Sequence, residues 1–182
     1  MAEISTCSKR ILRKAGLADL ETLCRFFQNV CHRLNTRINY PLWNWGIYPD
    51  ESVLHEAIVQ EEMVVFCEKE RIVGAARISP YLEGMDAFEW TDSRFNCIHL
   101  FCIDPDFSGQ KLGDVFLGQI LSQLKKEGYA SARLNLIAGN APAKALYERA
   151  GFHSKGTSEV LLEKEGTLPF ELMEYIFPVQ NG

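Results

Sequence analysis

The feature that most constrains the fold is an apolar stretch in the second half of the chain. Residues 96–103 read Asn-Cys-Ile-His-Leu-Phe-Cys-Ile, which is too hydrophobic to leave one face in water and is typical of a buried central strand. Asp104-Pro105 ends the stretch, a glycine-bearing loop follows, and helical apolar spacing predicts a helix from Leu112 to near Gly128. In such a unit the loop N–H groups and the helix dipole converge on one point, which suits a diphosphate.

A second informative segment, residues 140–152, reads Asn-Ala-Pro-Ala-Lys-Ala-Leu-Tyr-Glu-Arg-Ala-Gly-Phe. Asn140 can cap a helix through its side chain, and Gly151 can leave the helix with positive φ before a new strand opens. Leu146 and Tyr147 are adjacent, so their side chains point about 100° apart around the helix. With Leu146 packed inward, the pattern predicts a tyrosine hydroxyl held on a rigid helix.

Together the two segments resemble the GCN5-related N-acetyltransferases (GNAT), a family that transfers an acetyl group from acetyl-coenzyme A to an amine. Residues 140–152 are similar to the family's Asn-x-x-Ala-x-x-Leu-Tyr-x-x-x-Gly-Phe, and residues 103–113 are similar to its coenzyme A pyrophosphate loop. The segments at 11–20 and 64–78 are similar to its first strand and helix and to its second and third strands. The likeness therefore covers nearly the whole chain.

The resemblance implies an α+β protein with the GNAT fold, in which a mixed, mostly antiparallel central sheet is flanked by helices on both faces. The strand that ends at Ile103 and the strand at Ser131–Ile137 are expected to run parallel, because a helix joins them. A chain of 182 residues suits one substantial core better than two, so we expect a single domain over residues 1–182.

The pyrophosphate loop departs from the family pattern Arg/Gln-x-x-Gly-x-Gly/Ala. Counted from Pro105, Ser108 stands at the Arg/Gln position, Lys111 at the first glycine and Gly113 at the second small residue. A register shifted to Gln110 and Gly113 would need two inserted residues and would put Val115 where a small residue is wanted. We favour the unshifted register because it keeps the apolar residues of the helix on its buried side, namely Leu112, Phe116, Leu117 and Ile120. A lysine where positive φ is needed costs about 1 kcal/mol relative to glycine, although its charge can meet a phosphate.

The resemblance also implies acetyl-coenzyme A as the co-substrate. Its diphosphate is expected to lie against the loop N–H groups and its pantetheine arm near Asn140, with a backbone N–H of residues 101–103 facing the thioester oxygen. Because the net charge is −5, local cations must meet this polyanion, and Lys111 is preferred over Lys144 and Arg149. The residues expected to contact the coenzyme are Phe101, Cys102, Ile103, Gly109, Gln110, Lys111, Leu112, Gly113, Asp114 and Asn140.

The implied reaction needs a base for the amine and a donor for the departing sulfur. A primary amine is mostly protonated at neutral pH, so a side chain or a water chain must accept its proton before nitrogen attacks. His99 is the candidate base, since an ordinary histidine has a pKa of about 6.5, although a lone histidine in an apolar strand is more often a packed, hydrogen-bonded residue. Glu89 and Asp92, before the strand, are alternatives. The resemblance assigns the donor to Tyr147, whose competing role is that of a core aromatic, and it implies no covalent enzyme intermediate.

The acceptor is expected to meet residues 35–50, where aromatic side chains are dense. This stretch resembles the Trp-x-x-Gly-x-Tyr-Pro loop of some bacterial members of the family. Its aromatic side chains suit a pocket wall or lid, and they could equally pack a long loop against the core. Trp90 is expected near the same mouth. The residues concerned are Arg37, Tyr40, Trp43, Trp45 and Tyr48, with Gly46 and Pro49 completing the motif.

Composition narrows the class of partner and compartment. A net charge of −5 argues against nucleic acid, and no apolar run is long enough to span a bilayer. The six cysteines have no metal-like spacing, so we expect no metal site and reduced thiols in a cytoplasmic protein that is a monomer or homodimer.

Three functions follow as hypotheses. The leading one is an N-acetyltransferase that acts on the primary amine of a small molecule or a peptide N-terminus in a ternary complex. The second is a coenzyme A-binding GNAT-fold module with little or no turnover, because Ser108 and Lys111 alter the loop. The third is an interaction protein that binds no coenzyme.

Overall fold

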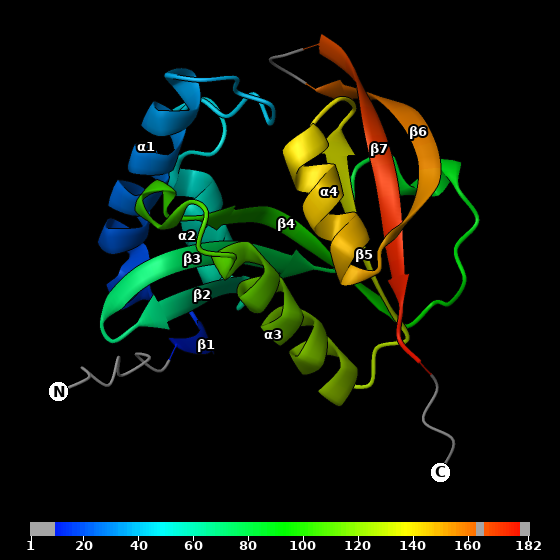
Figure 1. Ribbon diagram of the computed structural model, residues 1–182, viewed down its shortest axis with the longest axis horizontal. Helices are drawn as coiled ribbons and strands as arrows, with labels where there is room; N and C mark the ends of the chain where they lie inside the picture. The colour runs from blue at the N-terminus through cyan, green and yellow to red at the C-terminus, as the bar shows by residue number, and fades with distance from the viewer. Residues whose placement is uncertain (1–9, 163–165, 179–182) are drawn as a thin grey trace, which may run out of the picture.

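A computed structural model of the chain describes residues 10–162 and 166–178. The strands are β1 (Arg10–Lys14), β2 (Met63–Glu68), β3 (Arg71–Ser79), β4 (Phe95–Ile103), β5 (Ser131–Ile137), β6 (His153–Leu162) and β7 (Gly166–Ile176). They form one sheet with the order β1-β2-β3-β4-β5-β7-β6 (Figure 1). β4 and β5 run parallel and the other neighbouring pairs run antiparallel, which confirms the predicted mixed, mostly antiparallel sheet.

Helices cover both faces of the sheet: α1 (Leu20–Asn35) and α2 (Glu51–Val59) lie on one face, and α3 (Leu112–Lys126) and α4 (Ala141–Ala150) lie on the other (Figure 1). Alternation along β2 explains this arrangement. Phe66 packs in the core under α3, whereas Met63 and Val65 pack in the core under α1 and α2. Short 3₁₀ helices at Leu17–Asp19 (η1), Met85–Ala87 (η2) and Pro105–Phe107 (η3) interrupt the connections.

The parallel strands β4 and β5 pair only at their beginnings. Their register partners are Phe95 with Ser131, Asn96 with Ala132 and Cys97 with Arg133. From Ile98 onward the edge of β4 that faces β5 therefore has no strand partner in the described chain. The two strands diverge beyond this point and open a gap in the middle of the sheet.

A bulge in β4 faces the opposite neighbour. Cys102 pairs with Ala75 and His99 pairs with Arg77, so Leu100 and Phe101 together stand opposite one residue of β3. Leu100 has φ of 48°, in the left-handed region that a branched side chain rarely occupies. The bulge changes the direction of the backbone within the gap.

Local signals place α4 at one side of this gap. The Asn140 side chain accepts a hydrogen bond from the N–H of Ala143 at 3.2 Å, and Gly151 ends the helix with φ of 101°. The helix at 141–150 and its two caps agree with the sequence prediction. The strand at Ser131–Ile137 is also confirmed, and β4 begins one residue earlier than predicted.

Candidate active site

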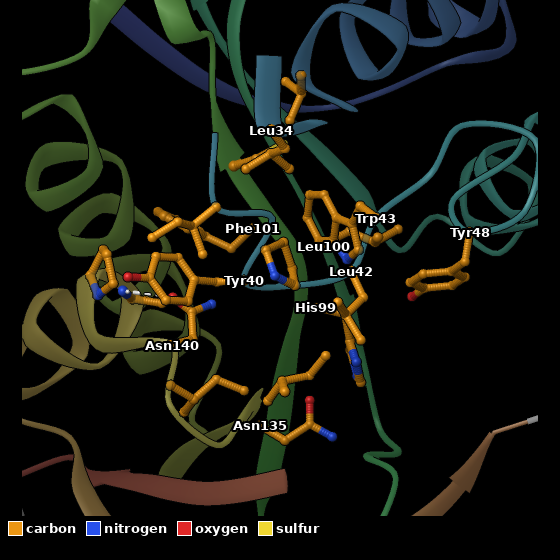
Figure 2. Close-up of a pocket in the computed structure, with 18 of the residues that line it drawn as sticks. Leu34, Tyr40, Leu42, Trp43, Tyr48, His99, Leu100, Phe101, Asn135 and Asn140 are labelled. Carbon is orange, nitrogen blue, oxygen red and sulfur yellow. Dashed lines mark hydrogen bonds between the residues drawn. The ribbon is translucent and has the colours of Figure 1, made fainter. Parts of the chain in front are cut away.

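A cavity of about 1050 Å³ occupies the gap between β4 and β5. Its walls come from these two strands, the beginning of α4, the segment between α1 and α2, and the β6–β7 hairpin (Figure 2). Of the residues predicted from the sequence, those on β4 and α4 line it and those of the loop at 109–114 do not. The residues predicted to bind the coenzyme or act in catalysis that line it are His99, Phe101, Cys102, Ile103, Asn140 and Tyr147.

Tyr147 is the buried residue of α4, with 7% of its surface exposed. Its ring lies edge-on to Phe101, with centroids 6.2 Å apart, and 5.8 Å from the ring of Phe152. In the described chain no group hydrogen-bonds the Tyr147 hydroxyl, although the residue lines the cavity. Burial raises the pKa of Tyr147 well above its ordinary value, so the phenol keeps its proton and can act as a donor.

His99 is held at the mouth of the gap by a backbone carbonyl. Its Nε2 lies 2.6 Å from the carbonyl oxygen of Tyr81. Because a carbonyl can only accept, Nε2 carries the hydrogen and Nδ1 keeps its lone pair in the neutral ring. Burial lowers the pKa of His99; Glu83 and Glu62 oppose this shift and Arg77 adds to it. The imidazole is therefore neutral near pH 7 and can accept a proton.

The alternative bases from the sequence lie elsewhere. Glu89 and Asp92 do not line the cavity. The Asp92 carboxylate accepts a hydrogen bond from the N–H of Arg94 at 2.7 Å, within its own turn. Glu83 lines the cavity instead. It is one of several acidic residues in an irregular segment, and nothing in the local sequence distinguishes it.

The loop between η3 and α3 presents free backbone N–H groups. In the described part of the chain, no group accepts a hydrogen bond from the N–H of Gly109, Lys111, Leu112, Gly113 or Asp114. The N–H of Gln110 is used locally, since it donates to the Phe107 carbonyl at 3.3 Å. These N–H groups lie at the positive end of α3, as an anion site requires.

Lys111 is the N-cap of α3 and has φ of 55°, so it occupies the left-handed conformation expected for the family's first glycine. The other two candidate cations are paired: Lys144 Nζ lies 2.8 Å from Glu171 Oε1, and Arg149 lies 3.1 Å from Asp114. Among residues 10–162 and 166–178 no carboxylate pairs with Lys111. Its charge is therefore available to an anion.

The aromatic residues between α1 and α2 divide into two groups. Tyr40, Trp43 and Tyr48 line the cavity, whereas Trp45 packs only against the core under α1 and α2. Trp43 lines the cavity and also packs against that core, since the centroid of its ring lies 6.1 Å from the ring centroid of Phe27. The segment is thus a wall of the cavity that is anchored in the core.

Trp90 does not lie at this mouth, contrary to the sequence prediction. Its Nε1 donates to the Met85 carbonyl at 2.7 Å, and the guanidinium of Arg133 lies over its ring at 4.3 Å. These contacts hold Trp90 among residues that do not line the cavity.

Among the described residues, no helix has both the length and the apolar character that crossing a bilayer demands.

Comparison with known proteins assigns the family. The model of the acetyltransferase (GNAT) family matches residues 27–152. The chain therefore belongs to the GNAT family, and the resemblance predicted from its motifs is confirmed.

Curated relatives match over shorter segments. The [ribosomal protein bS18]-alanine N-acetyltransferase of Escherichia coli K12 is 43% identical over 51 residues, which are 28% of this chain and 34% of that protein. The mycothiol acetyltransferase of Brachybacterium faecium is 31% identical over 96 residues, 53% of this chain and 27% of that protein. The matched segment thus spans about a third or less of these relatives' length.

Solved structures share the fold over almost the whole chain. A GNAT-family acetyltransferase from Streptococcus agalactiae superposes with a TM-score of 0.77 at 16% identity, covering 93% of this chain and 96% of that one. yncA from Salmonella typhimurium, solved with its cofactor acetyl-CoA, gives a TM-score of 0.68 at 16% identity, covering 96% and 98%. At these identities the likeness concerns the fold alone, and it confirms the predicted α+β GNAT fold.

Proposed function

We propose that the protein transfers an acetyl group from acetyl-CoA to the primary amine of a small molecule or a peptide N-terminus. The carrying observation is that the cavity opens where β4 and β5 stop pairing, and that the unpaired strand edge, Tyr147 and His99 all line it. The family match and the names of the relatives support acetyl transfer to nitrogen.

The residues present fit acetyl-CoA, a thioester that carries a diphosphate. The free N–H groups at 109–114 and the unpaired charge of Lys111 suit the diphosphate. The unpaired edge of β4, at Phe101, Cys102 and Ile103, suits the amides of the pantetheine arm, with Asn140 at the other side of the gap. When bound, the coenzyme supplies an acyl group already activated for transfer.

The side chains divide the proton transfers between them. His99 accepts the proton of the acceptor amine at Nδ1, since Nε2 is engaged with Tyr81. A backbone N–H of the β4 bulge donates to the carbonyl oxygen as its charge develops. Tyr147 donates to the sulfur that leaves. Burial raises the pKa of the Cys102 thiol well above its ordinary value, so this thiol stays protonated and direct transfer to the amine is favoured over an acyl-cysteine.

Acetyl-CoA consumption with a panel of primary amines, followed by detection of the free thiol, tests the proposal. Calorimetric titration with coenzyme A runs in parallel. Thiol release that depends on an amine supports the transferase. Binding of coenzyme A without thiol release for any amine would favour the GNAT-fold binding module, and no binding at all would favour an interaction protein.

We further propose that residues 1–182 form one cytoplasmic domain that is a monomer or homodimer. The single sheet that contains all seven strands, from β1 at one edge to β6 at the other, supports one domain. The five cysteines of the described residues carry no disulfide, which suits a reducing compartment.

A further inference from the structure

The segment after β3 closes one end of the cavity, and three central strands hold it there. Ser79 Oγ of β3 donates to the Tyr81 carbonyl at 3.2 Å, and His99 Nε2 of β4 donates to the same oxygen. Asn135 Nδ2 of β5 donates to the carbonyl of Glu83 at 3.1 Å. The backbone of Glu83 is therefore fixed across the gap between β4 and β5. Glu83 lines the cavity, and its carboxylate forms no ion pair with any described residue.

Charge is distributed unevenly along the cavity. Arg33 and Arg37 line it, and Arg33 forms an ion pair at 3.5 Å with Asp106 of η3, just before the loop at 109–114. Glu83 lines it on the side of His99 and Asn135. The remaining acid of the lining, Asp50, accepts a hydrogen bond from the Val53 N–H and caps α2. The distribution suits an anionic coenzyme at one side and a cationic acceptor at the other.

The wall between these two ends is apolar. Ile38, Leu42, Ile47 and Tyr48 each expose 40% or more of their surface, and all four line the cavity. Large apolar side chains are normally scattered singly over a protein surface, so four on one cavity wall indicate a ligand with an apolar body. Tyr48 and Trp43 add aromatic rings to this wall (Figure 2).

Building on the acetyl transfer proposed above, we propose that Glu83 binds the ammonium group of the acceptor. The acceptor is then a primary amine with an apolar or aromatic body and no carboxylate beside the nitrogen. A carboxylate there would face Glu83 in a confined space, where like charges repel strongly. Aryl-alkyl amines and peptide N-termini with an apolar first residue share this chemistry, whereas free amino acids lack it.

The negative charge of Glu83 affects the pKa values of two neighbouring groups, His99 and Tyr48. Its charge opposes the fall in pKa that burial imposes on His99. Tyr48 also lines the cavity. Desolvation and the charge of Glu83 raise its pKa to about 12, while the charge of Arg77 opposes this rise. An ammonium bound by Glu83 would therefore be close to the base that must deprotonate it.

The transfer balances with these groups. The ammonium gives one proton to His99 Nδ1, and the nitrogen lone pair bonds to the acetyl carbon. The carbon–sulfur bond breaks with its electron pair on sulfur, which Tyr147 stabilises with a hydrogen bond. The sulfur takes up a second of the nitrogen's protons by way of water. The products are an acetamide, a free thiol and one proton released from His99 to solvent.

Phenylalaninamide and phenylalanine form a matched pair of probes, because they differ at the group beside the amine. We expect the wild-type protein to have a higher kcat/KM for the amide, and Glu83→Gln to lower kcat/KM for the amide by about tenfold, mainly through KM. The same variant should lose most of the preference for the amide over the acid. Comparing variant with wild type cancels the difference in basicity between the two probes. Asp86→Asn is the control, since Asp86 is an acidic residue of the same segment that does not line the cavity.

An unchanged preference in Glu83→Gln, or a wild-type protein that acetylates phenylalanine as well as its amide, would overturn the role of Glu83. Failure of every amine in the wild-type protein would instead contradict acetyl transfer itself, so the two ideas fail separately. 2-Phenylethylamine and a phenylalanyl peptide amide then identify the source of the amine: small amines are favoured if the first is the better substrate, and peptide N-termini if the second is.

Discussion

Replacement of Tyr147 by phenylalanine isolates one hydroxyl. The ring contacts with Phe101 and Phe152 remain, and the hydroxyl has no hydrogen-bond partner in the described chain whose loss would disturb the fold. We therefore expect the free energy of unfolding to change by less than about 1 kcal/mol. Coenzyme A affinity should be nearly unchanged, because the hydrogen bond from the hydroxyl to sulfur strengthens only as negative charge develops on sulfur in the transition state.

The magnitude of the rate effect follows from the acidity of the phenol. Burial raises the pKa of Tyr147 further above that of an ordinary thiol, which is about 8.5. The tyrosine is therefore a weaker acid than the group it serves and acts chiefly as a hydrogen-bond donor to the thiolate. Loss of one such donor lowers kcat by about 10²- to 10³-fold, or about 2.7–4 kcal/mol of transition-state stabilisation.

The assay is initial-rate thiol release on an acceptor that the wild-type protein acetylates, with coenzyme A affinity measured by calorimetry. Tyr175→Phe is the control, because Tyr175 packs in the same core, with its ring 5.6 Å from that of Phe152, and does not line the cavity. A Tyr147→Phe protein that binds the coenzyme and turns over at the wild-type rate would refute the reasoning and leave Tyr147 as a core aromatic.

Three further predictions concern the base and the two ends of the coenzyme. Because burial lowers the pKa of His99, its free base persists below pH 6.5. In the wild-type protein kcat/KM should therefore fall only as the pH drops through that lowered value. His99→Gln should remove this fall from the pH–rate profile. Lys111→Gly should raise the free energy of unfolding by about 1 kcal/mol, because it relieves the left-handed backbone conformation of the lysine. It should also weaken coenzyme A binding severalfold at low salt. Denaturant titration and calorimetry measure the two effects, and undiminished affinity would show that the charge is dispensable. Asn140→Asp keeps the acceptor for the Ala143 N–H but removes the amide donor, so stability should hold while coenzyme affinity falls. Asn140→Ala removes both and should also cost about 1 kcal/mol of stability. Equal affinities of Asn140→Asp and the wild-type protein would remove Asn140 from the site.

Features encoded within one element could be predicted from the sequence. The cap at Asn140, the stop at Gly151 and the position of Tyr147 are all fixed by residues within one short helix. The parallel pairing of β4 and β5 was also predictable, because a strand, a helix and a strand in succession leave few topologies. Lys111 could be placed in the left-handed region because the strand before it and the helix after it fix the register of the loop.

Features that depend on distant segments could not be predicted. Glu83 reaches the cavity because side chains of β3, β4 and β5 hold its backbone there, and no pattern near Glu83 encodes those contacts. Trp90 was expected at the cavity mouth because it is aromatic and close in sequence to the central strand. Its position is decided instead by Arg133, which is more than 40 residues away.

Arg133 also explains how β4 and β5 can diverge without destabilising the sheet. It occupies the last paired position of β5, opposite Cys97, and is only 1% exposed. Its guanidinium lies 3.6 Å from the ring centroid of Phe95 and 3.3 Å from Glu174 on the adjacent strand, so the buried charge is compensated by an ion pair and aromatic rings. These contacts join β4, β5 and β7 at the point where the parallel strands diverge. Since the strands are secured there, backbone groups beyond it can stay unpaired, and an edge that would otherwise be a weakness of the sheet becomes available to a coenzyme.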